Sequence, residues 1–325
     1  MACSRPIDIF CKETSHGYLV PCGRCEECLH RKKMSFVHRC EQEKLHGKFA
    51  HCYFVTLTYK DAFLPYESFS TKKNGAPVSP DSTGEAVLCP YDLSLFFHRY
   101  RNFSEDSIRY FACGEYGDPK LTHRPHYHII LFTNSPWKEC VNNCNLAWSY
   151  LVAESKEQRA ERYKLQRKLK RPIKRDSRSM LNRVSIGRVQ VTSVTYKRIC
   201  YVAKYVNKIL FSDEPIKPFY RISNGLGDGF LSTETAKLCS VQNRHYTYFQ
   251  NGLPVALSRF YSRRLFTAQQ MIDYQLDIIR EEDCPEQIFL SGGFRLWWIA
   301  KSRELERQRR FTRVSHSGLL KFYGK

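Results

Sequence analysis

Alternating or continuous hydrophobic positions predict β-strands in four stretches of the chain. These are residues 52–59, 109–117, 122–132 and 188–194, which are rich in β-branched and aromatic side chains. Residues 118–120, Asp-Pro-Lys, have the composition of a turn. We therefore expect the second and third strands to pair as a hairpin.

Six further stretches have the composition or the periodicity of helices. They are residues 26–46, 91–101, 156–171, 196–210, 267–282 and 297–313. The 91–101 stretch is amphipathic, with Leu93, Phe96 and Phe97 on its apolar side. The sequence therefore predicts both strands and helices in a chain with enough apolar residues for a sizeable core.

The chain is strongly basic. Its 325 residues include 52 Lys and Arg against 32 Asp and Glu, which gives a net charge of +20. Such a field favours polyanionic partners, nucleic acid first and an anionic membrane surface second. No apolar run is long enough to span a membrane, and residues 1–6 lack the pattern of a signal peptide, so we expect a cytoplasmic protein with reduced cysteines.

Positive charge gathers in two segments. Residues 156–178 are dense in Lys and Arg and contain only Glu157, Glu161 and Asp176 as acids, which favours contact with phosphates over a merely solvated helical face. Residues 253–265 interleave aromatic and basic side chains, an arrangement that suits single-stranded nucleic acid. The side chains predicted to contact DNA are Arg167, Lys168, Lys170, Arg171, Arg259, Arg263 and Arg264.

Two histidines make the predicted strand 122–132 a candidate metal site. Side chains alternate between the two faces of a strand, so His126 and His128 point the same way. An ion held by two imidazoles needs a third protein ligand and open positions for substrate. We expect Glu115, on the neighbouring strand, to supply that ligand, with His123 as an alternative; two ordinary strand histidines are the simplest alternative to a metal site.

A second candidate site lies on the predicted helix 196–210. At about 100° per residue, Tyr201, Lys204, Tyr205 and Lys208 fall within one arc, opposite the apolar side chains. A tyrosine phenolate can attack phosphorus to form a covalent phosphotyrosine, and an adjacent ammonium favours the phenolate. With a divalent ion nearby, this pattern indicates phosphoryl transfer on a nucleic acid. The alternative is an exposed Tyr/Lys face that binds nothing.

The run Cys22-Gly-Arg-Cys25-Glu-Glu-Cys28 is a third cluster that could hold a metal ion. Reduced cysteines at close spacing suit structural Zn²⁺. The fourth ligand would come from Cys3, Cys11, His16 or Cys40. The run lacks the downstream second pair of a usual zinc knuckle, so a helix start with incidental thiols is the alternative.

These motifs, in this order, resemble those of the HUH endonucleases that initiate rolling-circle replication, and most closely the microvirus initiators of the gokushovirus type. The resemblance rests on residues 54–59, 114–117, 124–128 and 201–208, with further likeness at 21–28, 225–227 and 259–265. It implies an α+β fold with a central antiparallel sheet flanked by helices. It also implies metal ligands His126, His128 and Glu115, nucleophiles Tyr201 and Tyr205, and helper residues Lys204 and Lys208.

The same resemblance implies a reaction and its setting. With Mg²⁺ or Mn²⁺, the protein would nick the origin of phage replicative-form DNA, form a 5′-phosphotyrosine link, free a 3′-hydroxyl and rejoin single-stranded circles. It would act in the host bacterial cytoplasm and depend on a host helicase and DNA polymerase. We accordingly divide the chain into a Cys-containing segment with a helix (1–50), a nuclease domain (51–211) with a basic insertion (155–178), and a basic C-terminal extension (212–325).

Other function classes stay open. A plasmid initiator, a relaxase or a single-strand transposase would share the chemistry, although a relaxase is expected to carry three clustered histidines and a transposase one tyrosine. A non-catalytic protein that binds single-stranded DNA or RNA would use the aromatic and Arg residues, with the two histidines purely structural. Covalent attachment of DNA to tyrosine would separate the enzymes from the binding protein.

Overall fold

The computed structural model of the chain describes residues 3, 5, 7–11, 16–66, 85–117, 123–152, 155–170, 172, 182–208, 212–249, 252–271 and 273–274. The chain forms two compact units. We call Arg39–Phe230 the sheet unit, and Met1–His38 with Leu231–Lys325 the terminal unit. The sequence-based division into three segments stays a prediction.

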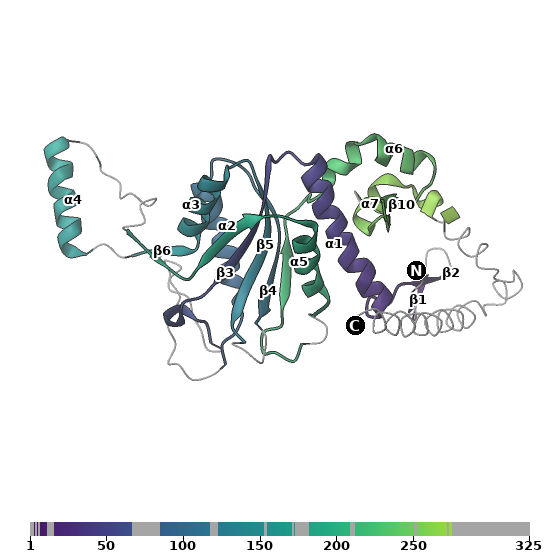
Figure 1. Cartoon of the computed structure of the whole chain (residues 1–325), viewed down its shortest axis with the longest axis horizontal. Coiled ribbons are helices and arrows are strands. Elements are labelled where there is room, and N and C mark those ends of the chain that lie inside the picture. Colours follow the sequence, from purple (N-terminus) through teal and green to yellow (C-terminus); the bar gives the residue numbers. More distant parts are fainter. Residues whose placement is uncertain are drawn as a thin grey trace, which may run out of the picture. The chain divides into compact units, whose positions relative to one another are not determined.

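Five antiparallel strands form the centre of the sheet unit, in the order β8-β3-β5-β4-β9 (Figure 1). They are β3 (His51–Thr58), β4 (Arg109–Tyr116), β5 (Pro125–Thr133), β8 (Val189–Ser193) and β9 (Phe219–Ile222). The expected α+β fold with a central antiparallel sheet is therefore confirmed. The predicted pairing of β4 with β5 is also confirmed, while the turn at 118–120 lies outside the described residues.

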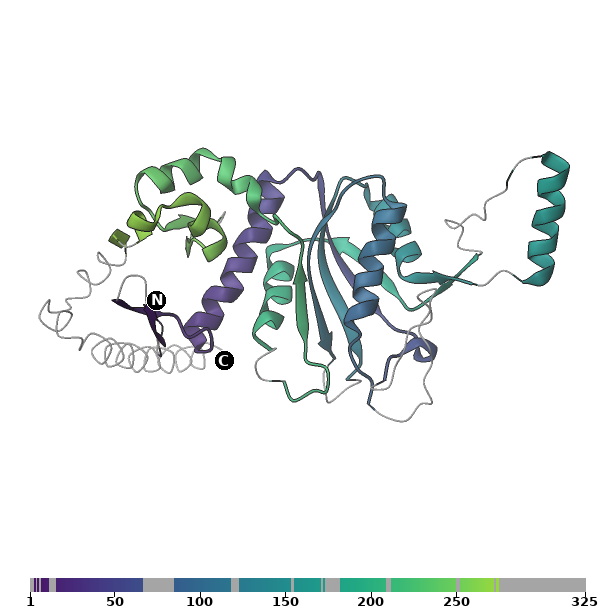
Figure 2. The same cartoon turned by 180° about the vertical axis from the view of Figure 1, so that it is seen from behind.

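Helices cover both faces of this sheet (Figures 1 and 2). The helices of the unit are α2 (Pro90–Phe103), α3 (Trp137–Ala147), α4 (Lys156–Leu169) and α5 (Tyr196–Lys208), with the short strands β6 (Ser149–Leu151) and β7 (Arg183–Ser185) beside them. α2 and α3 pack together over one face, where Tyr127 and Ile129 of β5 join the core. α5 packs against β4, β5 and β9 on the other face.

Tyr127 shows how this core fixes the orientation of β5. Its side chain is fully buried, and its hydroxyl donates to the Cys89 carbonyl oxygen at 2.8 Å. The Tyr59 hydroxyl lies 2.8 Å from that of Tyr127 and donates to the buried Asp92 carboxylate at 2.8 Å. A slip of one residue in the strand pairing would turn Tyr127 out of this network and leave buried polar groups without partners. The network therefore holds the residues on either side of Tyr127 on the α5 face.

The terminal unit is built from short elements and one long helix. They are β1 (Ile7–Cys11), β2 (His16–Val20), α6 (Glu234–Val241), β10 (Tyr246–Tyr248), β11 (Pro254–Ala256) and α7 (Arg259–Leu265), and α1 (Glu26–His46) has residues in both units. His38 of α1 is fully buried, with its ring 5.8 Å from that of Phe249 and 5.4 Å from that of Tyr261. Among the described residues, no helix has the length and apolar character needed to cross a membrane.

Most predicted helices that fall on described residues are confirmed. The helices expected at 26–46, 91–101, 156–171 and 196–210 appear as α1, α2, α4 and α5, although residues 209–210 lie outside the described part. Of residues 267–282, those described are helical at 268–271 and 273–274, and 297–313 lies outside the described residues. The helices α3, α6 and α7 were not predicted.

Candidate metal and tyrosine site

Glu115, His126 and His128 meet on the α5 face of the sheet. Glu115 of β4 lies directly opposite His126 in the strand register, and His128 follows two residues later on β5. Glu115 Oε1 is 3.1 Å from His126 Nε2 and 3.0 Å from His128 Nε2. One ligand atom from each residue lies within 4.8 Å of the others. The structure thus brings together the three residues that the sequence predicts as metal ligands.

The hydrogen bonds behind the two imidazoles fit this donor set to a cation. His126 Nδ1 lies 3.0 Å from the Arg124 carbonyl oxygen, which can only accept, so Nδ1 carries the proton. A neutral ring then presents the Nε2 lone pair to the Glu115 carboxylate. His128 Nδ1 is similarly engaged by the Thr56 hydroxyl at 3.1 Å. Two nitrogen lone pairs and a carboxylate oxygen facing one another at about 3 Å would repel, and a divalent cation among them would satisfy all three.

Burial and hydrogen bonding set the charges of this cluster. Burial alone would raise the pKa of the Glu115 carboxyl, but hydrogen bonds with His126 and His128 hold that pKa well below its ordinary range. Burial lowers the pKa of His128. At neutral pH the cluster therefore contains a carboxylate and a neutral His128, the protonation states in which both residues ligate metals.

His123, the alternative third ligand, lies elsewhere. Its Nε2 pairs with Glu214 Oε1 at 2.9 Å, and its ring stacks on Tyr116 with 5.1 Å between centroids. In the described part of the chain, the group that contains His126 and His128 is completed by Glu115 and does not include His123.

Tyr201 and Tyr205 of α5 reach the same cluster. The Tyr201 hydroxyl donates to Glu115 Oε1 at 3.1 Å and lies 3.5 Å from His128 Nε2. The Tyr205 hydroxyl donates to that of Tyr201 at 2.8 Å. Tyr201 is 37% exposed and Tyr205 only 3%, and burial raises the pKa of both phenols. Both tyrosines therefore face the metal cluster, and Tyr201 is the one open to solvent.

The two lysines predicted as helpers are described to different extents. The Lys204 ammonium lies 4.1 Å from the centre of the Tyr201 ring and 4.8 Å from that of Tyr205. This cation–π geometry places positive charge against both phenol rings. Lys208 is the last residue of α5, and its side chain lies outside the described part of the structure.

Two residues of β3 complete the surroundings of His128, and neither was predicted as a site residue. Thr56 hydrogen bonds its Nδ1, and the Phe54 ring stacks on the imidazole with 5.3 Å between centroids. The sequence signal for both was the alternation of residues 52–59, which places Phe54 and Thr56 on one strand face. That face looks onto the candidate site and not onto bulk solvent.

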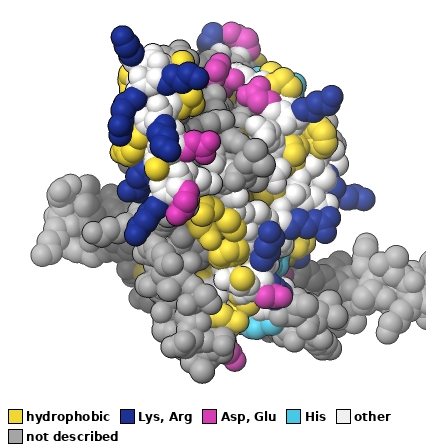
Figure 3. Space-filling model, turned by 90° about the vertical axis from the view of Figure 1, so that its left-hand side faces the viewer, with side chains coloured by type: hydrophobic (Ala, Val, Ile, Leu, Met, Phe, Trp, Pro, Cys, Tyr) yellow, Lys and Arg dark blue, Asp and Glu magenta, His cyan; other side chains and the backbone are white. Residues whose placement is uncertain are grey.

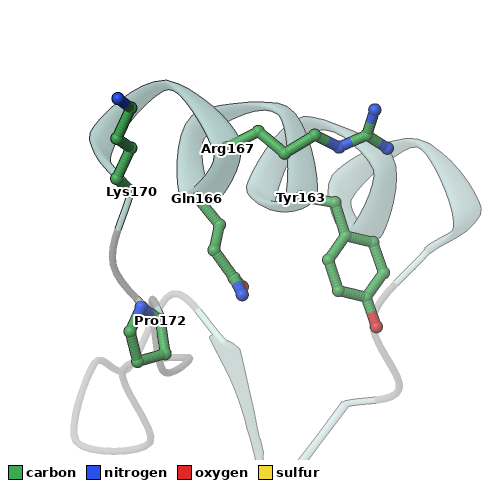
Figure 4. Close-up of a pocket in the computed structure, with 5 residues that line it drawn as sticks. All are labelled: Tyr163, Gln166, Arg167, Lys170 and Pro172. Atoms are coloured by element: carbon green, nitrogen blue, oxygen red, sulfur yellow. The ribbon is translucent and has the colours of Figure 1, made fainter.

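The predicted DNA-contacting residues lie on α4 and α7. No residue of α4 is buried, and Lys and Arg are frequent on the face that Figure 3 shows. A pocket of about 350 Å³ lies beside α4, and Tyr163 and Gln166 extend to the opposite side of the helix from the Lys170 ammonium (Figure 4). The other lining residues are Arg167, Lys170 and Pro172. Arg171 lies outside the described residues, and Arg259, Arg263 and Arg264 belong to α7 of the terminal unit.

The predicted cysteine cluster gains a fourth member in the structure. Cys22, Cys25 and Cys28 of the terminal unit lie together with Cys3, and all four Sγ atoms are within 4.8 Å of one another. Cys40 is fully buried in α1 and is not part of this group. The side chains of Cys11 and His16 lie outside the described part of the structure.

Comparison with known proteins relates the sheet unit to phage replication proteins. Residues 52–210 match the family model of the replication-associated proteins of the ORF2 type. The chain is 30% identical over 117 residues to replication-associated protein ORF2 of Spiroplasma virus 4, a match that covers 35% of this chain and 31% of the relative. It is 25% identical over 197 residues to replication-associated protein ORF4 of Chlamydia phage 1, which covers 59% and 39%.

The matched segments thus span about a third of the length of these two curated relatives. No solved structure matches the chain. The family match includes Glu115, His126, His128, Tyr201 and Tyr205, so the whole candidate site lies in the part of the chain that resembles phage replication-associated proteins.

Proposed function

We propose that this chain initiates rolling-circle replication of a small single-stranded DNA phage by nicking and rejoining DNA through tyrosine. The observation that carries the proposal is the position of the Tyr201 hydroxyl, 3.1 Å from the Glu115 oxygen that also faces both His128 and His126. A nucleophile beside a metal-ligand set is the arrangement that phosphoryl transfer requires. The similarity to phage replication-associated proteins supports the same function.

Three side chains would hold the metal ion. His126, His128 and Glu115 supply two nitrogens and one oxygen, a donor set that accepts Mn²⁺ or Mg²⁺ and leaves coordination positions open. When bound, the ion would neutralise a non-bridging phosphate oxygen and orient the scissile phosphate.

Tyr201 would make the first attack. Its oxygen forms a bond to phosphorus, the bond between phosphorus and the 3′ oxygen breaks, and the released 3′-hydroxyl serves as a primer. Lys204, whose ammonium lies 4.1 Å from the Tyr201 ring centre, favours the phenolate over the phenol. The 5′-phosphotyrosine conserves the phosphodiester energy, so the strand can later be rejoined without ATP.

Tyr205 would perform a second transfer. Its hydroxyl lies 2.8 Å from that of Tyr201, one helical turn further along α5. When Tyr201 carries a strand end, Tyr205 can attack the next origin copy, and the freed 3′-hydroxyl can then resolve the first link. Two adjacent tyrosines would therefore permit nicking and circle closure within one site.

The remaining parts of the proposal concern the DNA and the host. The basic side chains of α4 and α7 would contact phosphates of single-stranded and replicative-form phage DNA, and these contacts carry no sequence information by themselves. Strand separation and synthesis would depend on a helicase and a polymerase of the bacterial host, in whose cytoplasm the protein would act.

The test is covalent capture of DNA. The purified chain is incubated with circular single-stranded phage DNA and Mn²⁺, separated on a denaturing gel and mapped by peptide mass spectrometry. We expect an adduct on the peptide that contains Tyr201 and Tyr205, abolished by His126→Ala and by removal of the metal. His98→Ala, an exposed histidine of α2, is the matched control and should leave the adduct unchanged.

The opposite result has a defined meaning. If the wild-type chain binds the DNA tightly and in a salt-sensitive way but forms no adduct, the chain is a single-strand binding protein and the enzyme proposal fails.

A further inference from the structure

A second group of metal-ligating side chains lies in the terminal unit, apart from the Glu115 site. The Cys3 and Cys25 Sγ atoms are 3.7 Å apart, and all four Sγ atoms of Cys3, Cys22, Cys25 and Cys28 lie within 4.8 Å of one another. A Zn–S bond of about 2.3 Å in a tetrahedron places sulfur atoms about 3.8 Å apart. A disulfide requires about 2.05 Å. The sulfur spacing therefore matches tetrahedral coordination and not a covalent S–S bond.

The backbone around these cysteines is folded for thiolates. The backbone N–H groups of Arg24 and Cys25 donate to Cys22 Sγ at 3.4 and 3.3 Å, and the N–H of Cys22 donates to Cys3 Sγ at 3.2 Å. A neutral thiol accepts weakly, whereas a metal-bound thiolate is a charged acceptor. Gly23 adopts φ +73°, a conformation that side chains rarely allow, and it forms the tight turn between Cys22 and Cys25.

The number and burial of the ligands indicate a structural role. Four cysteine sulfurs fill a tetrahedral zinc site and leave no position for water or substrate. Cys3 is 5% exposed and Cys28 is 7% exposed, so two of the sulfurs come from buried residues. The cluster also joins two separate stretches of chain, since Cys3 precedes the β1–β2 hairpin and Cys28 lies in the first turn of α1.

We propose that Cys3, Cys22, Cys25 and Cys28 bind one structural Zn²⁺ ion that fastens the N-terminal segment to the start of α1. Binding of the ion stabilises this part of the terminal unit, because metal ligation by residues brought together only in the folded chain adds its free energy to folding. The site is independent of the nicking chemistry, since none of its ligands belongs to the sheet unit.

The test measures zinc in the full chain. After dialysis against EDTA at neutral pH, we expect the wild type to retain one zinc per chain by elemental mass spectrometry. Exchange for Co²⁺ should give thiolate-to-metal charge transfer and the strong d–d absorption of a tetrahedral site. His128→Ala should retain the zinc and the same spectrum, because an ion at the Glu115 site has no sulfur ligand.

Variants of one cysteine identify the ligands. Cys3→Ser should lose the retained zinc, whereas Cys3→His, which keeps a ligating side chain, should retain it with weaker charge transfer. Cys52→Ser, a half-buried cysteine on β3, is the matched control and should bind zinc as the wild type does. A wild-type chain without retained zinc, a Cys3–Cys25 disulfide found by mass spectrometry, or equal zinc content in Cys3→Ser and the wild type would overturn the proposal.

Discussion

Arg109 holds three parts of the sheet unit together, and its replacement by methionine should destabilise the protein severely. Its guanidinium lies 2.9 Å from Glu43 of α1 and pairs with both carboxylate oxygens of Asp228, at 2.5 and 2.9 Å. The Glu43 side chain is 0% exposed and that of Asp228 is 43% exposed. Arg109→Met would leave a buried carboxylate with the Gly227 N–H at 2.6 Å but without its cation. Loss of one partner of such a buried pair costs about 3–5 kcal/mol.

The assay is urea unfolding followed by tryptophan fluorescence. At a slope of about 2.5 kcal/mol per M, the loss lowers the midpoint by about 1–2 M. Asp228→Asn, which removes a half-exposed partner, should cost less than about 1 kcal/mol. The double variant Arg109→Met with Glu43→Leu should recover most of the loss, because no buried charge is left alone. If Arg109→Met costs less than about 1 kcal/mol, or the double variant is no better than the single one, the assignment of the stability to this ion pair is wrong.

Three further predictions concern the nucleophiles, a buried histidine and a close backbone contact. Tyr201→Phe should abolish the first covalent DNA adduct, whereas Tyr205→Phe should keep that adduct on the denaturing gel but lose circle closure; the reverse pattern would assign the first attack to Tyr205. Burial lowers the pKa of His38 from 6.5 to about 4, so the unfolded chain binds this proton first. The stability that neutral His38 provides above pH 6.5 is lost as the pH falls toward 4, by about 3 kcal/mol. His38→Leu should remove that part of the pH dependence of urea unfolding, and an unchanged profile would contradict it. A Cβ on Gly187 would overlap the Thr58 carbonyl oxygen, so Gly187→Ala should cost about 1–3 kcal/mol or more in the same assay, and an unaltered midpoint would contradict this close approach.

The candidate site was largely predictable because it depends on short-range rules. Strand alternation alone places His126 and His128 on one face, and an antiparallel hairpin brings Glu115 opposite His126. Helical periodicity places Tyr201 and Tyr205 on one side of α5. These patterns require only a strand or a helix of ordinary geometry, so they survive ignorance of the rest of the fold.

What the sequence did not provide comes from packing between elements. The helical wheel set Tyr205 among polar residues, yet it is 3% exposed because β5 and β4 cover the side of α5 that carries it. α3 was missed since its buried side consists partly of small residues such as Cys140, Cys144 and Ala147, which give a weak apolar pattern. Cys3 was one of four possible partners for the cysteine run, and only the folded chain brings it within reach.

The site and the core of the sheet unit are specified by the same strand register. Tyr127 belongs to the core on one face of β5, and the two histidines that flank it belong to the site on the other. The neighbouring strands repeat this division, since Thr56 pairs with His128 across β3 while Val55 lies in the core. A shift of register by one residue would exchange the two faces on every strand. The packing of α2 against the sheet therefore selects the one pairing in which metal ligands and tyrosines meet, and the geometry of the chemistry follows from the stability of the core.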